Sequence, residues 1–195
     1  MTDTAGPNRW PRRLAILVGL LILIVAGGAA YLPRADGPLF VFAGGPFRSG
    51  EPVDFAQVDW DALDALTELE MEIVGARRSL ILWFSVEEGV PYVACDLDCM
   101  DGQLTRWPQQ IERDPRVVIR IDGKRVDARL RYLPHEAAEY QAARAGRNLK
   151  YSGDGDARAA AETAAHGVVV GVGEALTGRA QRPEPGDRLY RIDPR

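Results

Sequence analysis

Two cysteines are the side chains best able to do chemistry on their own, and they are the first and last residues of the short stretch CDLDC. Cys95 and Cys99 are four residues apart, a spacing that can satisfy disulfide geometry in a loop but does not require a bridge. The alternative is a metal site with Asp96 and Asp98 as oxygen ligands. Mixed thiolate and carboxylate ligands suit no single common metal well. We therefore expect no metal centre, and the choice between a disulfide and free thiols stays open.

The other chemistry-bearing motifs supply no catalytic group. The two histidines, His135 and His166, have no serine, cysteine or acidic residue at a catalytic spacing. Gly171 and Gly173 form a G-x-G, but no third glycine follows at the spacing of a dinucleotide-binding fingerprint. The sequence also contains no Walker motif, zinc-ligand spacing or nucleophile elbow. It therefore identifies no catalytic residue, and the catalytic groups of any activity stay unknown.

An uncharged, apolar run of 19 residues, 14–32, stands close to the N-terminus. As a helix this run spans roughly 28 Å at ~1.5 Å per residue, close to the thickness of a bilayer's hydrocarbon core. We expect a transmembrane anchor here. The alternative is a cleaved signal peptide, because the small residues at 28–30 offer a cleavage site.

The charges around this run predict its orientation. Arg9, Arg12 and Arg13 precede it, whereas few basic residues follow it closely. The positive-inside rule then predicts a cytoplasmic tail over residues 1–13. It places residues 33–195 on the outer, periplasmic or extracellular, side of the cell membrane, in a single-pass topology. A disulfide is permitted in that compartment.

The net charge excludes one class of partner. The whole chain carries a formal charge of −4, and residues 33–195 hold 21 basic and 27 acidic side chains. An acidic domain of this kind is a poor candidate for binding nucleic acid or for adhering to a membrane through a polybasic surface. We therefore expect no nucleic-acid partner.

The outer part begins with an arm rich in proline and glycine, residues 33–58. We expect it to be extended, with one short strand over 39–43. Asp59 can cap a short helix that runs to about Leu66. The folded domain is predicted to occupy residues 59–195.

Hydrophobic periodicity predicts that strands dominate this domain. Three glutamates alternate with apolar residues in the first strand, which predicts one solvated face. Asp122-Gly123 is the preferred pair for a type I′ turn and separates two of the strands. The expected strands are 69–73, 80–86, 91–95, 116–121, 124–132, 168–172 and 188–192. Residues 80–86 are apolar on both faces, so this strand should be covered on both sides.

Short helices fill the spaces between the strands. We expect them over 104–113, 135–146 and 157–165, with a polar, glycine-rich loop over 148–156. Several strands joined by tight turns, with few helices, favour a closed or nearly closed barrel. The sequence thus predicts a mainly β (α+β) fold, an antiparallel β-barrel with peripheral helices, preceded by one N-terminal transmembrane helix.

The order of these elements resembles a known family. The residues that carry the resemblance are RRSLILWFSVEEGVPYVAC at 77–95 and TRWPQQIERDPRVVIRIDGK at 105–124. They are similar to the split β-barrel of the flavin-binding pyridoxamine 5'-phosphate oxidase-like and deazaflavin-dependent nitroreductase-like superfamily. Residues 189–192 resemble the family's last strand, and 44–50 resemble a stretch that precedes the barrel in an anchored, uncharacterised branch.

The resemblance implies a cofactor, FMN or the deazaflavin F420, whose phosphate is held by basic residues. It implies six cofactor-binding positions in this sequence: Arg78, Ser79, Trp83, Thr105, Arg106 and Trp107. The two tryptophans stand where the family often has lysines, so about half of the expected positive charge is missing. They can instead stack on an aromatic ligand or pack in an interface. The resemblance also implies a homodimer, which the doubly apolar strand 80–86 favours independently.

Two functions from different classes follow. The first is a membrane-anchored oxidoreductase that binds a flavin or deazaflavin and moves electrons to a small molecule or quinone, with the cofactor doing the redox chemistry. The second is a cofactor-free split-barrel binding module, tethered to the membrane, for a small hydrophobic ligand or a protein partner. The two missing lysines favour the second function.

Overall fold

The computed structural model describes residues 10–39, 42–95, 106–151 and 188–195. The helices are α1 (Trp10–Tyr31), α2 (Trp60–Leu63), α3 (Trp107–Arg113) and α4 (Ala138–Tyr151), with the 3-10 turns η1 (Leu32–Arg34), η2 (Phe55–Gln57) and η3 (Val74–Ala76). The strands are β1 (Gly37–Leu39), β2 (Phe42–Gly45), β3 (Glu51–Pro52), β4 (Glu68–Ile73), β5 (Arg78–Glu87), β6 (Val90–Cys95), β7 (Arg116–Ile121), β8 (Lys124–Tyr132) and β9 (Arg188–Pro194).

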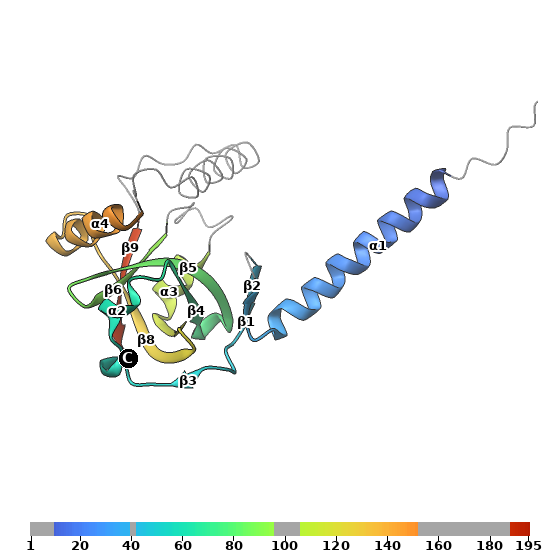
Figure 1. The fold of residues 1–195 in the computed structure, drawn as a ribbon. Helices are drawn as coiled ribbons and strands as arrows, with labels where there is room; N and C mark the ends of the chain where they lie inside the picture. The colour runs from blue at the N-terminus through green and yellow to red at the C-terminus, as the bar shows by residue number, and fades with distance from the viewer. Residues whose placement is uncertain (1–9, 40–41, 96–105, 152–187) are drawn as a thin grey trace, which may run out of the picture.

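Six of the strands close into an antiparallel barrel. Hydrogen bonds join β5, β4, β7, β8, β9 and β6 in that order, and β6 pairs back with β5 to complete the ring. Figure 1 shows α1 leaving the domain on one side and α4 lying against the opposite side. The predicted fold class is confirmed: an antiparallel barrel with a few peripheral helices and one N-terminal apolar helix.

Local sequence signals explain the strands of the barrel. The turn between β7 and β8 has positive φ at both Asp122 (48°) and Gly123 (72°), as the type I′ turn requires. In β4, Leu69, Met71 and Ile73 are buried and the glutamates between them face outward. The expected strands at these positions are confirmed.

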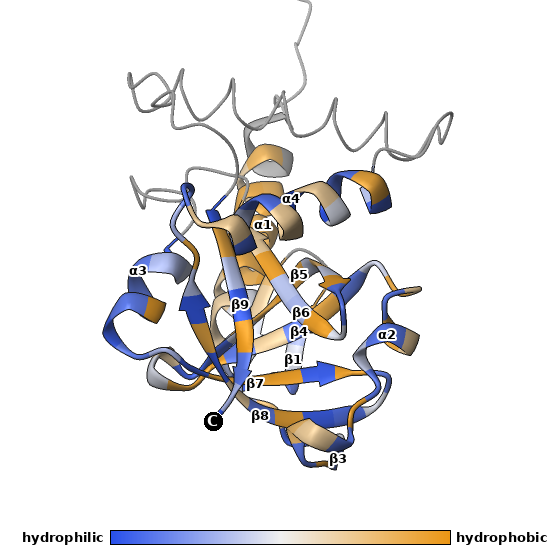
Figure 2. Cartoon of the chain, turned by 90° about the vertical axis from the view of Figure 1, so that its left-hand side faces the viewer, coloured by the Kyte–Doolittle hydropathy of each residue, from blue (hydrophilic) through white to orange (hydrophobic). Residues whose placement is uncertain are grey.

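Two hydrophobic cores lie on the two sides of the barrel wall. Figure 2 shows hydrophobic and hydrophilic residues alternating along strands of the barrel. The larger core fills the barrel interior and includes Met71, Phe84 and Val117. The smaller core lies under α4 and includes Tyr92 and Tyr140. Alternate residues of β6 pack in one core or the other, because successive side chains of a strand point to opposite faces.

Part of the outer face of β5, at Ser79 and Trp83, is covered by the same chain. Gly44 of β2 pairs with Ser79, and Tyr151 at the end of α4 stacks on Trp83 with ring centroids 5.4 Å apart. Much of the apolar character of β5 therefore has an explanation within one subunit, and it no longer supports a dimer by itself. The homodimer stays a prediction.

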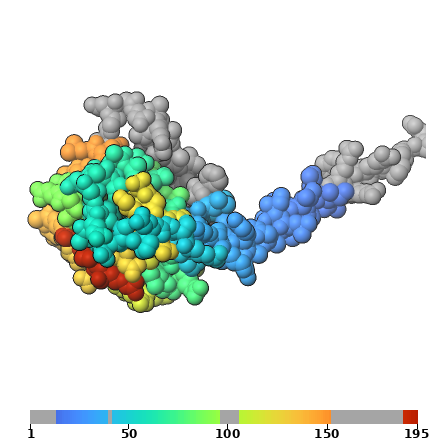
Figure 3. Space-filling model, turned by 60° about the horizontal axis from the view of Figure 1, so that its bottom comes forward, coloured from blue at the N-terminus to red at the C-terminus, as the bar shows by residue number. Residues whose placement is uncertain are grey.

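The arm differs from its expected form. A single strand over 39–43 is wrong, because the chain instead forms an antiparallel hairpin in which Gly37 pairs with Gly45 and Leu39 with Phe42. Beyond the hairpin, β3 pairs in parallel with β8. Figure 3 shows the arm, in blue and cyan, lying along the yellow surface of β8. The arm is therefore part of the domain surface.

The helices keep their predicted places but not their lengths. Asp59 caps α2 by accepting a hydrogen bond from the Ala62 amide (3.1 Å), yet α2 ends at Leu63. His135 lies in the turn before α4, and α4 continues to Tyr151 through part of the predicted loop. The helix predicted at 157–165 and the strand at 168–172 lie outside the described residues.

The N-terminal helix α1 is long and apolar enough to cross a membrane, and none of its apolar window is buried against the domain. Its 22 residues correspond to a length of roughly 33 Å. Both a membrane anchor and a signal sequence fit these properties. The expected position of the apolar segment is confirmed.

Of the two alternatives for the cysteines, a disulfide or free thiols, the structure shows a disulfide. Cys95, at the end of β6, is disulfide-bonded. The chain has one other cysteine, Cys99, which lies outside the described residues. Among the described residues there is also no cluster of side chains able to hold a metal ion.

Candidate functional site

Arg78 lies at the rim of the barrel interior. It follows η3 and Arg77, whose left-handed backbone (φ 51°) redirects the chain into β5. The register between β4 and β5 is regular from Arg78 onward, so Arg78 shares a strand face with Leu80 and Leu82, which pack against the barrel core. Arg78 itself is exposed and makes no hydrogen bond or ion pair with another described residue.

Arg106 lies at the same end of the barrel. It occupies the N-cap position of α3 and is exposed. The helix packs on β4 and on η3, the turn that leads into Arg78. At the other end of α3, a Cβ added to Gly75 would lie only 2.9 Å from the carboxylate of Asp114. Arg106 thus stands at the N-terminal end of α3, and η3, which leads into Arg78, contacts its C-terminal end, so the two arginines flank α3 at the same end of the barrel.

Ser79 faces away from solvent. Its side chain is fully buried, and its hydroxyl donates a hydrogen bond of 2.6 Å to the carbonyl oxygen of Gly45. That bond joins β5 to β2 at a point where a Cβ on Gly45 would collide with the backbone of Pro33. A contribution of Ser79 to cofactor binding stays a prediction. In the structure its hydroxyl binds the arm instead.

The two tryptophans lie on different sides of the barrel wall. Trp107 is buried in the interior core, with its ring 5.0 Å from that of Tyr190. Trp83 is five positions from Arg78 and so projects from the opposite face of β5. There it stacks on Tyr151 and its Nε1 donates a long hydrogen bond (3.4 Å) to Glu68.

The structure therefore brings together only part of the predicted set. Arg78 and Arg106 lie on either side of α3 at the same end of the barrel, with Trp107 following Arg106 into the interior core. Trp83 is separated from them by the wall, and Thr105 lies outside the described residues. The cofactor roles of all six residues remain predictions, and the described geometry favours the two arginines.

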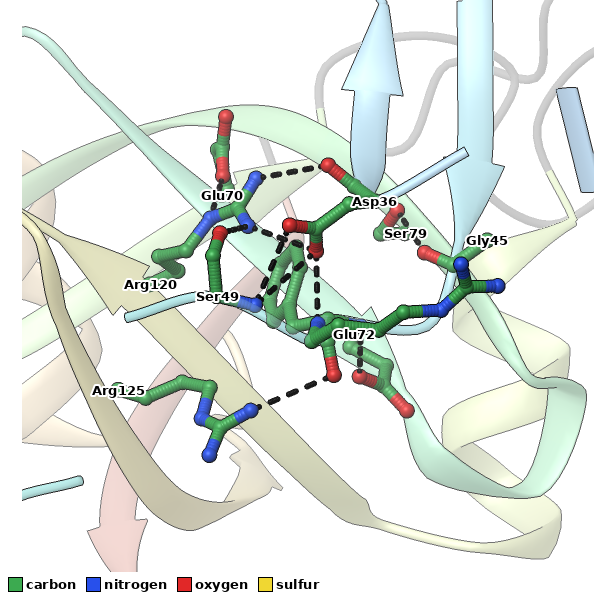
Figure 4. A network of polar contacts seen from close by, with 10 residues as sticks. Asp36, Gly45, Ser49, Glu70, Glu72, Ser79, Arg120 and Arg125 are labelled. Atoms are coloured by element: carbon green, nitrogen blue, oxygen red, sulfur yellow. Dashed lines mark hydrogen bonds and ion pairs between the residues drawn. The ribbon is translucent and has the colours of Figure 1, made fainter. Parts of the chain in front are cut away.

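A second polar site joins the arm to the barrel, and the sequence patterns did not identify it. Arg120 of β7 is bound by Glu70 through its Nε, and its Nη1 lies 3.1 Å from the carboxylate of Asp36 and 3.0 Å from the hydroxyl of Ser49. The guanidinium also lies 4.3 Å above the ring of Phe47. Figure 4 shows these groups converging on Arg120. We call this group of residues the arm clamp.

Asp36 is the acidic centre of the arm clamp. Its carboxylate accepts hydrogen bonds from the backbone amides of Arg48 (2.7 Å) and Ser49 (3.2 Å). The hydrogen bond with Ser49, these amides and the charge of Arg120 lower the pKa of Asp36 to about 2, against a smaller opposing effect of burial. The hydrogen bonds favour the charged form, so Asp36 is ionised at neutral pH.

Glutamates that were expected to be solvated also hold the arm. Glu70 binds Arg120, its cross-strand neighbour in the β4–β7 pair, and Glu72 accepts a hydrogen bond of 2.7 Å from the amide of Phe47. The expectation of a wholly solvated face on β4 is therefore wrong. The sequence contains the signal for the Glu70–Arg120 pair, but only once the strand register is known.

Beside the arm clamp lies an open cleft of about 460 Å³ on the outer face of the barrel. Its floor is formed by β4, β5 and β7, and its rim by the arm and the β7–β8 turn. The lining residues are Ser49, Gly50, Leu66, Glu68, Leu69, Glu70, Ile81, Arg120, Ile121, Asp122 and Gly123. The cleft combines apolar side chains with carboxylates, and its arginine is already bound by Glu70 and Asp36.

Comparisons with known proteins add little to this description. No protein-family model matches the chain, and no curated protein matches it. Among solved structures, the chain is similar to a FAD-binding protein from Mesorhizobium loti, with a TM-score of 0.37 and 14% sequence identity. The match covers 70% of this chain and 87% of that one. A likeness this weak carries no functional argument, so the fold assignment rests on the strand pairing itself.

Proposed function

We propose that residues 33–195 form a membrane-anchored split-barrel domain that binds a flavin or deazaflavin, either FMN or F420, and passes electrons to a small molecule or quinone. The observation that carries this proposal is the exposed guanidinium of Arg78 at the barrel rim, which has no partner among the described residues. Arg106 supplies a second positive charge at the same end of the barrel. A planar guanidinium suits bidentate contact with a phosphate. The mouth of a β-barrel is also a common place for a ligand.

The described residues fit the phosphate end of such a cofactor. Arg78 and Arg106 supply two positive charges where the family places its basic residues, and Arg78 has no described partner to displace. The ring end fits less well, because Trp83 already stacks on Tyr151 and Trp107 lies in the core. The protein groups that face the ring would then be others than these two tryptophans.

A cofactor that supplies the redox chemistry would explain why the sequence offers no catalytic acid or base. A bound flavin or deazaflavin supplies the electron transfer, so the protein has to bind it, orient it and admit the substrate. Arg78 and Arg106 would bind and orient the phosphate. The barrel interior behind them, filled by side chains such as Phe84 and Trp107, would exclude water from that side.

The membrane anchor is part of the same proposal. We infer that α1 is retained and spans the membrane, with the arginine-rich tail in the cytoplasm and the barrel on the outer side. We also infer that two chains associate through their barrels, as the family resemblance implies. The length and composition of α1 support the anchor. The association rests on the resemblance alone.

The absorption spectrum of the full chain, purified in detergent, tests the proposal. We expect the visible band of a flavin or deazaflavin, with the ligand identified by its mass. Arg78→Ala should weaken cofactor binding about tenfold or more, because a hydrogen-bonded contact to a charged group is worth about 1.5–3 kcal/mol. Arg48→Ala is the matched control, since it removes an exposed arginine from the arm.

Two results would contradict the proposal. One is a colourless protein that also fails to bind added FMN or F420. The other is a coloured protein whose affinity falls equally in Arg78→Ala and Arg48→Ala, because the effect would then reflect net charge and not a site at the rim.

The cleft beside the arm clamp favours a second candidate function, a tethered module that binds a small hydrophobic ligand. Leu66 and Ile81 give this cleft apolar surface, and Glu68 stands at its edge with no arginine or lysine bound to it in the described chain. Carboxylates next to apolar surface select a ligand with a basic group. A hydrophobic amine is therefore the ligand class that fits best.

This second function is tested by calorimetric titration of the full chain with a long-chain alkylammonium ion below its micellar concentration. Ile81→Glu places a charge on the cleft floor and should abolish binding. Leu149→Glu is the control, because Leu149 is exposed and is not among the residues that line the cleft. Equal binding by both variants would eliminate the cleft as the site.

A further inference from the structure

The hairpin formed by β1 and β2 carries apolar side chains that the domain does not cover. Leu39 and Phe42 are cross-strand partners at the outer end of the hairpin, and they are 45% and 59% exposed. Most large apolar side chains of the barrel strands are buried. The exposure of this pair therefore calls for a partner outside the described chain.

The base of the hairpin is fixed firmly to the domain. A Cβ on Gly44 would overlap the backbone of Gly37, and a Cβ on Gly45 would lie 2.4 Å from the Pro33 carbonyl oxygen, so the strands approach as closely as glycine permits. At the base of the hairpin, the Asp36 carboxylate accepts a hydrogen bond from the Arg48 amide. A rigid base holds the exposed side chains in a defined position.

The hairpin also lies next to the end of α1. Only η1 and two residues separate α1 from β1, and β2 packs on η1. Figure 1 shows the hairpin beside the C-terminal end of α1. At that end Tyr31 is 62% exposed, and Arg34 donates a hydrogen bond of 2.6 Å to the carbonyl oxygen of Ala30. An aromatic residue and an arginine at a helix end are typical of a membrane–water interface.

The sequence around the exposed pair has no charge that would oppose burial in lipid. Residues 37–47 read GPLFVFAGGPF, an uncharged run bounded by Asp36 and Arg48. A second copy of the chain fits this surface less well, because a stable protein interface buries about 800 Å² on each partner. Two side chains at the end of a narrow hairpin offer far less than that.

We propose that Leu39 and Phe42 insert into the interfacial region of the same membrane that α1 spans. The hairpin is then a second membrane contact, which prevents the barrel from swinging freely about the end of α1 and holds one face of the domain toward the lipid. This inference rests on the anchoring role of α1 in the proposed function.

Trp fluorescence of the full chain in phosphatidylcholine vesicles tests the insertion. Phe42→Trp places a probe at the hairpin, and the spectrum of the unsubstituted chain is subtracted to remove the native tryptophans. We expect blue-shifted emission, reduced to about half in vesicles with brominated acyl chains, because interfacial side chains lie ~5–10 Å deep. Leu149→Trp on α4, on the far side of the domain from α1, is the control and should not be quenched.

The outcomes separate this inference from the anchor on which it rests. Alkaline carbonate extraction of the same vesicles reports whether α1 spans the membrane. Membrane-retained protein with an unquenched probe at both Phe42→Trp and Leu39→Trp would overturn the hairpin contact and leave the anchor intact. Extractable protein would overturn the anchor, and quenching of the hairpin probe in that case would still support the contact. Emission that shifts with protein concentration and not with bromination would indicate a second copy and overturn the lipid assignment.

Discussion

Two regions of this molecule use arginine in opposite ways. In the arm clamp, Arg120 is bound by two carboxylates and a hydroxyl and lies over an aromatic ring. At the barrel rim, Arg78 is exposed and has no partner among the described residues. Both residues stand on strands of the same barrel, so their difference lies in what surrounds them.

The comparison teaches where a ligand can still be bound. A guanidinium such as that of Arg120, each of whose three nitrogens donates a hydrogen bond, stabilises the fold, and a new anion would have to compete with Glu70 and Asp36 for it. A guanidinium that faces water loses only hydration when it binds a phosphate. We therefore expect the arm clamp to contribute to stability, whereas the proposed binding site is the rim, and each expectation can be tested separately.

The largest effect is expected from Arg120→Ala. It should lower the free energy of unfolding by about 2–3 kcal/mol, because hydrogen bonds to charged groups are lost and two carboxylates are left without their counter-charge. Urea unfolding followed by circular dichroism measures the change. Arg131→Ala is the control, since Arg131 also binds two carboxylates but is 47% exposed, and it should cost less than about 1 kcal/mol. Equal effects would remove the distinction between a clamp and a surface ion pair.

A smaller effect is expected from Ser79→Ala. The substitution removes the buried donor to the Gly45 carbonyl and should cost about 1–2 kcal/mol. Ser85→Ala is a matched control on the same face of β5, because its buried hydroxyl has no hydrogen-bond partner in the described chain and its loss should be neutral or stabilising. If both variants unfold alike, the bond between β5 and the arm contributes nothing measurable.

Acid should weaken the arm clamp through Asp36. Its folded-state pKa, about 2, is below the ordinary value of 3.8, so its contribution to stability is complete above pH ~4 and is lost as the pH falls toward 2. The difference in unfolding free energy between the native chain and Asp36→Asn should therefore shrink over this range. A difference that stays constant from neutral pH down to pH ~2 would show that the Asp36 carboxylate does not stabilise the arm through its charge.

The sequence predicted the barrel well because its signals are local. The Asp122-Gly123 turn and the alternation in β4 each depend on a few neighbouring residues. The hairpin in the arm was missed because a short apolar run in 39–43 has no periodicity that separates one strand from two. The extension of α4 to Tyr151 depends on distant contacts, since the Tyr151 hydroxyl bonds the carbonyl oxygen of Phe84.

The candidate site was predicted only in part for a similar reason. Family resemblance assigns positions, but whether a side chain is free to bind depends on its neighbours in space. Ser79 and Trp83 are engaged by Gly45 and Tyr151, contacts that no local pattern encodes. The arm clamp was missed altogether, because Asp36 and Arg120 are 84 residues apart.

The smallest effect on stability is expected from Arg78→Ala, and it bears most directly on the comparison. An exposed side chain without described contacts should change the free energy of unfolding by no more than about 0.5 kcal/mol, the same as the control Arg48→Ala. Thermal unfolding of both variants without added cofactor measures this. A loss as large as that of Arg120→Ala would show that Arg78 also holds the fold together. Arg78 would then have a structural role like that of Arg120, and the proposed phosphate site would lose its main supporting residue.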